Sequence, residues 1–253
     1  NSYLIDDEMV ALVDTVDICY FEVYLRKIKQ VIGERPINYL IINHMEPDHS
    51  GSIRLIKQHY PEIIIVGNKQ TFGMIEGFYG VTGEQYLVKE GDFLALGHHK
   101  LRFYMTPMVH WPETMMTFDE TDGVLFSGDG FGCFGTVDGG FLDTRINVDK
   151  YWGEMVRYYS NIVGKYGSPV QKALQKLGGL PISAICSTHG PVWTENIAKV
   201  IGIYDRLSRY DADEGVVIAY GSMYGNTEQM AEAIAEELSA QGVKNIVMHN
   251  VTK

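Results

Sequence analysis

Short apolar runs of strand length recur along the chain, and stretches with apolar residues at helical spacing separate several of them. The runs occupy residues 37–42, 63–66, 101–105, 124–126 and 182–186. Helical spacing is found at residues 52–59 and 69–78, and also at residues 17–32, where the apolar positions are Tyr20, Val23, Leu25, Ile28 and Ile32. Before that helix, residues 3–5 and 11–14 have the composition of a strand hairpin. Strands that alternate with helices predict a layered α/β domain.

Residues that can bind metal ions follow four of these apolar runs. The first run is followed by His44, Glu46, Asp48 and His49, and the later ones by His110, Asp129 and His189. Open α/β folds place their sites where strand ends meet, so these side chains are expected to converge on one edge of a sheet. Taken singly, each has a simpler explanation as a solvated loop residue, a turn aspartate or a hydrogen-bonded core histidine. Their occurrence together favours metal binding.

The segment His44-Met45-Glu46-Pro47-Asp48-His49 is the densest part of this set. If the segment is extended, His44, Glu46 and Asp48 point to the same side. His110 completes one ligand set, which leaves Asp48, His49 and His189 for a second metal. Asp129 is the natural bridge, because a carboxylate can offer one oxygen to each of two cations. The mixture of imidazoles and carboxylates, with Glu46 among them, favours iron or manganese over zinc.

A second unit begins after the polar stretch 211–215, so residues 1–210 and 215–253 are expected to form separate domains. Strand 216–220 is followed by a loop, a helix over residues 228–240 and a strand at residues 245–248. The loop residues that could hold a phosphate are Ser222, Met223, Tyr224, Gly225, Asn226 and Thr227. Backbone N–H groups and hydroxyls between a strand and a helix N-terminus suit a phosphate monoester. The alternative is an ordinary helix cap formed by Thr227 with Glu228.

The composition restricts the partners and the compartment. The net charge of −11 argues against nucleic acid or an anionic membrane surface as a partner. No apolar run approaches the length of about 20 residues that spans a bilayer. Three scattered cysteines (Cys19, Cys133 and Cys186) and the lack of a secretory signal predict a cytoplasmic protein. The first residue is not Met and the second unit stops after one βαβ unit, so we expect a sequence cut at both ends.

These motifs, in this order, resemble those of flavodiiron proteins, in which a metallo-β-lactamase-like domain is joined to a flavodoxin-like domain. The resemblance is carried by His44-x-Glu46-x-Asp48-His49, His110 in HWPET, Asp129 in SGDGFG, His189 in THG and the loop from Ser222 to Thr227. It extends over essentially the whole chain. It implies an αββα metallo-β-lactamase-like sandwich followed by the first βαβ unit of a flavodoxin-like domain.

The resemblance also implies cofactors and residue roles. It implies two iron ions, with His44, Glu46 and His110 on one, Asp48, His49 and His189 on the other, and Asp129 bridging them. It places the phosphate of FMN in the loop 222–227 and Tyr158 near the substrate pocket. The implied activity is reduction of O2 to water or of NO to N2O, with the choice left open. The implied partners are rubredoxin or a reduced cofactor as electron donor, and a second copy of the chain in a head-to-tail homodimer.

Two other classes of function have to be weighed against this one. A binuclear hydrolase of the metallo-β-lactamase superfamily uses a metal-bound hydroxide. Such hydrolases carry a second histidine where this chain has Glu46, and the flavodoxin-type tail also argues against them. A metal-binding redox sensor without turnover has no positive support in the sequence. The sequence therefore predicts an oxidoreductase.

Overall fold

Two five-stranded sheets form the centre of the first unit, Asn1–Tyr210, in a computed structural model that describes residues 1–137 and 139–252. The first sheet has the order β1-β2-β3-β4-β5 and contains β1 (Tyr3–Ile5), β2 (Ala11–Val13), β3 (Tyr39–Ile41), β4 (Ile64–Gly67) and β5 (Gln85–Leu87). β1 and β2 form the predicted antiparallel hairpin, and the remaining neighbours are parallel. This parallel arrangement brings the carboxyl ends of β2, β3 and β4 to the same edge.

The second sheet has the order β10-β9-β8-β7-β6. Its strands are β6 (Phe93–Ala95), β7 (Lys100–Met105), β8 (Met115–Asp119), β9 (Val124–Gly128) and β10 (Ala184–Ser187). All neighbours are antiparallel except β9 and β10, which run parallel with Ile185 opposite Leu125. The segments that follow β9 and β10 therefore leave the sheet side by side.

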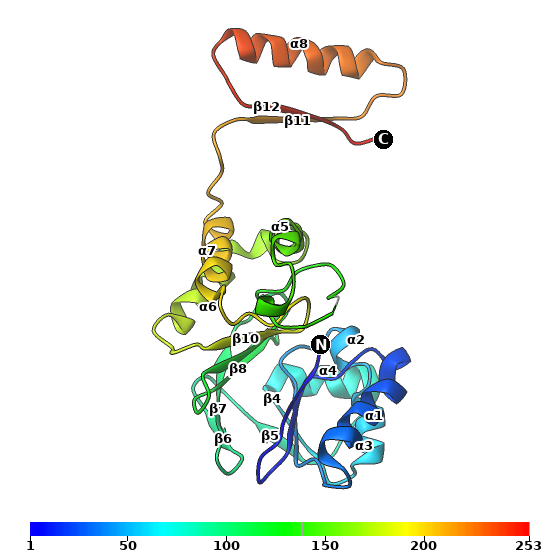
Figure 1. Cartoon of the computed structure of the whole chain (residues 1–253). Helices are drawn as coiled ribbons and strands as arrows, with labels where there is room; N and C mark the ends of the chain where they lie inside the picture. Colours follow the sequence, from blue (N-terminus) through cyan, green and yellow to red (C-terminus); the bar gives the residue numbers. More distant parts are fainter. Residues whose placement is uncertain (138, 253) are drawn as a thin grey trace. The chain divides into compact units, whose positions relative to one another are not determined.

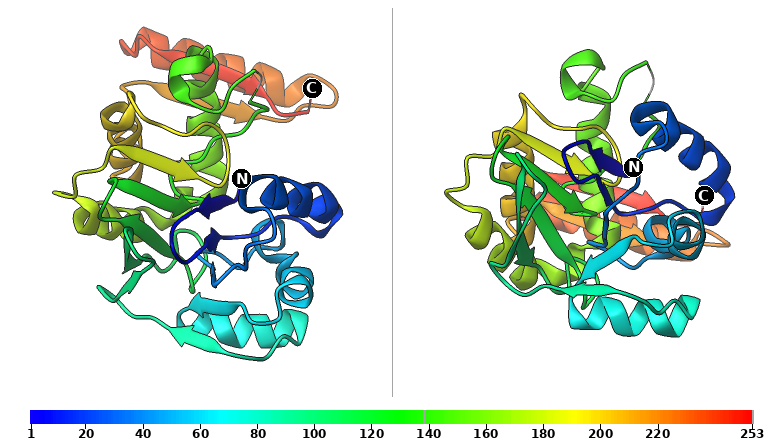
Figure 2. Two further views of the ribbon diagram at one scale, coloured as in Figure 1. Left: turned by 60° about the horizontal axis from the view of Figure 1, so that its bottom comes forward. Right: turned by 90° about the horizontal axis from the view of Figure 1, so that it is seen from below.

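Helices cover the outer faces of both sheets (Figures 1 and 2). The helices on the first sheet are α1 (Phe21–Ile32), α3 (Ile53–His59) and α4 (Lys69–Tyr79), and those on the second are α5 (Asp149–Ile162), α6 (Gly167–Leu177) and α7 (Ile197–Ser208). A third core lies between the sheets, where Ile41 and Val66 belong to the same buried cluster as Phe103. Burial of apolar side chains on both faces of each sheet stabilises the sandwich. The predicted αββα architecture is confirmed.

The local predictions differ from the structure at several places. Helix α1 begins at Phe21 after a 3-10 turn at Ile18–Tyr20, so Tyr20 and Val23 are 64% and 42% exposed instead of lying on the buried face. The sequence pattern also missed strands β5, β6 and β8 and helices α6 and α7. Strand β8 was missed because Thr117 and Asp119 interrupt its apolar pattern, although every residue of the strand is buried.

The second unit, Asp211–Lys253, consists of two parallel strands and one helix. Strand β11 (Val216–Tyr220) pairs with β12 (Ile246–Asn250), and α8 (Asn226–Ala240) connects them. The helix starts two residues earlier than predicted, and β12 lies later than the predicted strand. Across the described part of the chain, no helix is both long enough and apolar enough to span a membrane.

Candidate metal centre

Four segments bring histidines and acidic residues together at one end of the sandwich. His44 follows β3, and Glu46 is the N-cap of the short helix α2 (Pro47–Ser50), which contains Asp48 and His49. The other three segments follow β7, β9 and β10 and supply His110, Asp129 and His189. The structure thus gathers every residue predicted as a metal ligand, in two groups that could each hold an ion.

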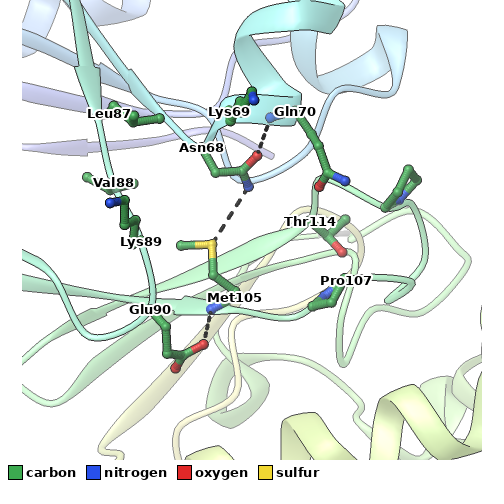
Figure 3. Close-up of a pocket in the computed structure, with 11 residues that line it drawn as sticks. Asn68, Lys69, Gln70, Leu87, Val88, Lys89, Glu90, Met105, Pro107 and Thr114 are labelled. Carbon is green, nitrogen blue, oxygen red and sulfur yellow. Dashed lines mark hydrogen bonds between the residues drawn. The ribbon is translucent and has the colours of Figure 1, made fainter.

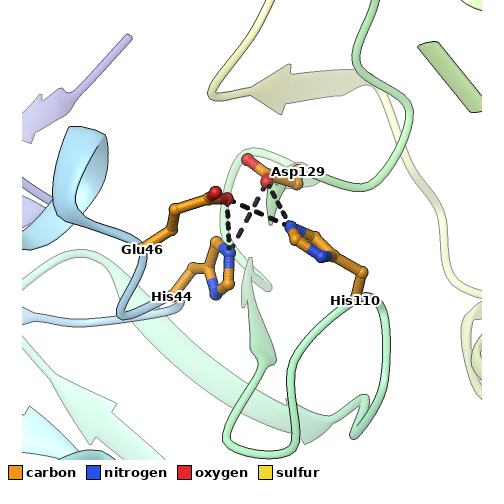
Figure 4. A group of neighbouring side chains, drawn as sticks. All are labelled: His44, Glu46, His110 and Asp129. Atoms are coloured by element: carbon orange, nitrogen blue, oxygen red, sulfur yellow. Dashed lines mark hydrogen bonds and ion pairs between the residues drawn. The ribbon is translucent and has the colours of Figure 1, made fainter. Parts of the chain in front are cut away.

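The first group consists of His44, Glu46, His110 and Asp129 (Figure 4). His110 Nε2 lies 3.1 Å from Glu46 Oε2 and 3.1 Å from Asp129 Oδ2. His44 Nε2 lies 3.4 Å from the same oxygen of Glu46 and 3.5 Å from the same oxygen of Asp129. Two ring nitrogens and two carboxylate oxygens therefore face one point.

The second group consists of Asp48, His49 and His189, with Asp129 beside it. The two ring nitrogens His49 Nε2 and His189 Nε2 are 3.0 Å apart. Asp48 Oδ2 lies 3.1 Å from the first and 3.3 Å from the second. Asp129 Oδ1 lies 3.0 Å from His49 Nε2, so the two oxygens of Asp129 face different groups.

These spacings fit the donor atoms of bound metal ions. With metal–donor bonds of about 2.1 Å, neighbouring donors lie about 3.0–3.4 Å apart in octahedral or tetrahedral geometry. In addition, His44 Nε2 is buried and makes no hydrogen bond within the described residues, although carboxylate oxygens surround it. A set of imidazoles and carboxylates without a thiolate suits iron, manganese or zinc. The donor atoms are therefore suited to hold two such ions.

The electrostatics of the first group favour a cation at its centre. Burial disfavours charge on His44, but Glu113 and Glu46 outweigh burial and raise the pKa of His44 to about 10. Burial likewise opposes the effect of Asp129 and Glu46 on His110, whose pKa is nevertheless raised to about 9. The hydrogen bond from His110 and the nearby imidazole of His44 lower the pKa of Glu46 to about 2. The carboxylates thus stabilise positive charge, which either protons or a metal ion can supply.

Asp129 has a lowered pKa for the same reason. Burial acts to raise the pKa of this carboxyl, and the hydrogen bonds from His110 and His49 overcome that effect and hold it well below its usual value. Asp129 is buried with 4% exposure and is therefore ionised in a site from which water is largely excluded. An ionised, buried carboxylate with two oriented oxygens is suited to a bridging role.

Three further residues, none of them predicted as part of the site, hold the ligand segments in place. Glu113 Oε1 lies 2.9 Å from His44 Nδ1, and Asp14 Oδ1 accepts the backbone N–H groups of Asn43 and His44. Thr188 Oγ1 donates to Asp129 Oδ1 at 2.6 Å. Asp14 directly follows strand β2, as Asp129 directly follows β9, and that position was the signal by which it could have been found.

Two details of the predicted site are wrong. The ligand segments do not share one edge of a single sheet, because β3 belongs to the first sheet whereas β7, β9 and β10 belong to the second. The segment 44–49 is also not extended throughout, since Pro47 starts helix α2. The turn of this helix directs Asp48 and His49 to the second group, while His44 and Glu46 join the first.

Tyr158 is placed beside the second group. Its ring centroid lies 5.6 Å from that of His189 and 5.0 Å from that of Phe134. The side chain is buried, and its hydroxyl makes no hydrogen bond to another described residue. Burial raises the pKa of Tyr158 well above its usual value, so the hydroxyl keeps its proton. A buried donor without a partner is thus available next to the candidate ligands.

The loop between β11 and α8 presents the predicted phosphate-binding residues. Ser222 Oγ accepts the backbone N–H of Gly225, which is the N-cap of α8. No side chain of the described residues caps this helix, and Thr227 lies within it, so the alternative of a Thr227 cap is wrong. Met223 and Tyr224 are 85% and 86% exposed. The first backbone N–H groups of α8 remain free to meet an anion.

An apolar cavity of about 410 Å³ lies beside the loop that carries His110 (Figure 3). Its described lining comes from residues 68–70 and 87–90 and from Met105, Pro107, Pro112 and Thr114, and none of the candidate ligands is part of it. Asn68 Nδ2, on its wall, donates to the carbonyl of Glu113 at 2.6 Å. The cavity wall therefore supports the ligand loop, while the metal-binding side chains converge elsewhere.

Comparisons with known proteins agree with this arrangement. The model of the ODP family beta lactamase matches residues 1–190, and the Flavodoxin model matches residues 218–253. The anaerobic nitric oxide reductase flavorubredoxin of Shigella dysenteriae is 32% identical over 243 residues, which are 94% of this chain and 50% of that protein. The diflavin flavoprotein A 1 of Synechocystis sp. is 34% identical over 247 residues, 96% of this chain and 43% of that protein.

Solved structures give the same result. The flavodiiron protein from Giardia intestinalis has a TM-score of 0.93 at 28% identity, covering 100% of this chain and 62% of that chain. Rubredoxin oxygen:oxidoreductase from Desulfovibrio gigas has a TM-score of 0.92 at 30% identity, covering 98% and 63%. The chain spans about half the length of the curated relatives named above. With an ODP family beta lactamase domain followed by a flavodoxin segment, this chain belongs to the flavodiiron protein family.

Proposed function

We propose that this chain belongs to an oxidoreductase that reduces O2 to water, NO to N2O, or both, at a pair of iron ions. The observation that carries the proposal is the division of the Asp129 carboxylate between two groups. Asp129 Oδ2 faces His110 Nε2 at 3.1 Å, and Asp129 Oδ1 faces His49 Nε2 at 3.0 Å. A buried carboxylate divided in this way fits two cations held a few ångströms apart.

The proposed ligands follow the two groups of side chains. The first iron is held by His44, Glu46 and His110, the second by Asp48, His49 and His189, and both by Asp129. When bound, two ferrous ions would supply two electrons to a small molecule. Coupling two NO to N2O and water takes two electrons and two protons, whereas reducing O2 to two water molecules takes four of each. The second reaction therefore requires a further electron source.

FMN is the proposed source of those electrons, with its phosphate in the loop Ser222–Thr227. The match of residues 218–253 to flavodoxin supports this assignment, as does the uncapped N-terminus of α8 behind the loop. The aligned peptide dipoles of a helix favour an anion at that end. The residues from Ser222 to Thr227, in the loop and the first turn of α8, are the proposed contacts.

Tyr158 is proposed to act at the substrate. Its ring packs beside His189, and its protonated hydroxyl makes no hydrogen bond to another described residue. A neutral phenol in such a place can donate a hydrogen bond to a substrate oxygen or deliver a proton to it. Because both reductions consume protons, a donor next to the metal ligands is useful for either substrate.

The proposed partners are a small electron-donor protein such as rubredoxin, or a reduced cofactor, and a second chain in a head-to-tail homodimer. The name of the Desulfovibrio gigas protein includes rubredoxin, which supports a small redox protein as the electron donor.

All three cysteines are free, in accord with a cytoplasmic location. Sedimentation of the purified protein, with and without FMN, tests the homodimer.

Metal analysis and gas analysis of this chain test the proposal. The chain is loaded with Fe(II) without oxygen, and the iron is counted before NO is added and N2O is measured by gas chromatography. We expect two irons and about one N2O per chain, since each N2O requires two electrons. The Asp129→Asn variant is expected to lose at least one iron and nearly all N2O.

The same material separates this proposal from the hydrolase alternative. A chain that retains two zinc ions, rejects iron and hydrolyses a β-lactam or a thioester would be a hydrolase. A chain that binds two irons but forms no N2O and consumes no O2 would contradict the proposed activity while leaving the metal centre in place.

A further inference from the structure

We infer that the two metal positions are unequal and that Glu113 makes the position at His44 the tighter one, so that this position is filled first. The inference rests on the proposed di-metal centre and concerns a residue outside the ligand set. Glu113 lies in the loop between β7 and β8, three residues after His110, and its side chain is completely buried.

Glu113 fixes the ring of His44 through one oxygen. Glu113 Oε1 lies 2.9 Å from His44 Nδ1 and also accepts the backbone N–H of Met45 at 2.9 Å. A carboxylate can only accept at this place, so the proton of the imidazole lies on Nδ1. His44 Nε2, the nitrogen left to bind an ion, is then directed at the first group, where Glu46 and Asp129 lie.

This contact also strengthens His44 as a ligand. A buried carboxylate behind a metal-binding imidazole makes the ring more basic and removes its rotational freedom. Glu113 is itself anchored, because its backbone carbonyl accepts Asn68 Nδ2 at 2.6 Å. Because Glu113 lies in the loop that presents His110 and contacts His44 and Met45, it connects this loop to the segment that presents His44. Both histidines of the first group are therefore positioned together.

Among the described residues, none supports the second group in the same way. His49 Nδ1 is buried and makes no hydrogen bond to any described residue. The other histidine of that group, His189, has a side chain that is 35% exposed, compared with 12% for His110. The acidic ligands of the two groups have similar exposure, since the side chain of Glu46 is 37% exposed and that of Asp48 is 41% exposed. The two groups therefore differ in their histidines.

A ring that is unanchored or exposed loses more freedom when it binds an ion, and its affinity is lower for that reason. The first ion is therefore expected at His44, Glu46 and His110. The second ion then binds at a group whose shared ligand, Asp129, is already oriented.

Anaerobic calorimetric titration of the 253-residue chain with Fe(II) tests the inference. We expect two separable binding steps in the wild-type chain. Glu113→Gln keeps an acceptor for Met45 N–H but removes the charge, and it is expected to weaken the tighter step by about tenfold or more. The weaker step is expected to stay within twofold of its wild-type affinity.

Asp143→Asn is the control. Asp143 is a buried carboxylate whose oxygens accept hydrogen bonds from Thr194 and Asn196, away from both groups. It is expected to leave both steps unchanged. The inference would be overturned if the two binding steps of the wild type had equal affinity, or if Glu113→Gln left the affinity of the tighter step unchanged. Either result would leave the proposed function standing. Binding of fewer than two irons by the wild type would overturn both.

A measurement on the wild-type chain guards against a variant that does not fold. In the zinc-loaded chain, nuclear magnetic resonance should detect a slowly exchanging Nδ1 proton on His44, assigned through its proximity to the Met45 amide. No such protected proton is expected on His49. Absence of the His44 proton, or equal protection of both, would contradict the role of Glu113.

Discussion

The hydroxyl of Thr188 donates a hydrogen bond of 2.6 Å to Asp129 Oδ1, the oxygen that faces His49. Thr188 follows β10 and Asp129 follows β9, and these two strands are parallel neighbours. The pairing of the strands therefore sets the orientation of the carboxylate that joins the two groups. A residue that touches neither proposed ion thus controls the direction of the shared ligand.

Thr188→Val is expected to weaken metal binding at the second position by about tenfold, because the shared carboxylate loses the contact that orients it. Valine keeps the shape of the side chain, so the loss of stability in the metal-free chain is expected to be about 1 kcal/mol. Fe(II) titration and urea unfolding measure the two effects. Thr188→Ser keeps the hydroxyl and serves as control. Unchanged affinity in the valine variant would show that Asp129 is oriented by other contacts.

Glu46→His is expected to move the metal preference of the chain from iron toward zinc. Glu46 Oε2 lies 3.1 Å from His110 Nε2, within the first group, and an imidazole there makes the donor set softer. We expect the ratio of zinc to iron bound from an equimolar mixture to rise by about tenfold, a difference of ~1.4 kcal/mol. Metal analysis measures the ratio. Glu84→His, at an exposed position, controls for an added histidine. An unchanged ratio would contradict the argument from donor hardness.

The residues of the candidate centre could be found from the sequence because each follows a strand-length apolar run. Asp129 directly follows β9, His189 follows β10 after one residue, and His44 follows β3 after two residues. A polar residue at the end of a buried strand is conspicuous against apolar neighbours. The layered fold could be predicted for the same reason, since the buried strands and helices carry the longest apolar patterns.

The supporting residues could not be found in this way. Glu113 lies inside a loop among residues of mixed character, and its contact with His44 joins positions that are far apart in the chain. Only tertiary structure creates such a contact. The helicity of α2 was missed because four residues are too few to form a periodic pattern, even though Pro47 is favoured at the first position of a helix.

Tyr158→Phe tests whether the buried hydroxyl contributes to turnover. The hydroxyl has no described hydrogen-bond partner, so its removal is expected to leave stability unchanged or raise it by up to about 1 kcal/mol. Iron content should stay at the wild-type value. The rate of N2O formation is expected to fall by about 10- to 100-fold if the phenol supplies a proton or hydrogen bond.

Tyr204→Phe is the matched control for this variant. Tyr204 is equally buried and its hydroxyl likewise lacks a described partner, but its ring packs on Phe131 and Tyr159 rather than on a candidate ligand. It is expected to keep the wild-type rate. A Tyr158→Phe variant with the wild-type rate would remove Tyr158 from the proposed mechanism.

Asp143 is expected to make the stability of the first unit depend on pH in the acid range. Asp143 Oδ1 accepts hydrogen bonds from the backbone and hydroxyl of Thr194, and Oδ2 accepts three from Glu195 and Asn196. Burial acts to raise the pKa of Asp143, but these hydrogen bonds outweigh it and lower the pKa below the ordinary value of 3.8. The ionised form is therefore the one that stabilises the segment before α7.

The sign of the pH effect follows from the lowered pKa. The contribution of Asp143 is complete above pH 3.8, the unfolded value, and is lost as the pH falls through the lower folded value. Asp143→Asn should cost about 2–3 kcal/mol at pH 7 and pH 5, because donors would lose a charged acceptor. The difference in the free energy of unfolding between this variant and the wild type should shrink below pH 3.8.

Urea unfolding at pH 7, 5 and 3, in the presence of a chelator, measures this difference without a contribution from metal release. Asp122→Asn, at an exposed position, is the control and should track the wild type throughout. A cost for Asp143→Asn that stays constant down to pH 3 would mean that hydrogen-bond geometry, and not the charge of Asp143, holds the segment from Thr194 to Asn196. A cost that grows on acidification would contradict the lowered pKa itself.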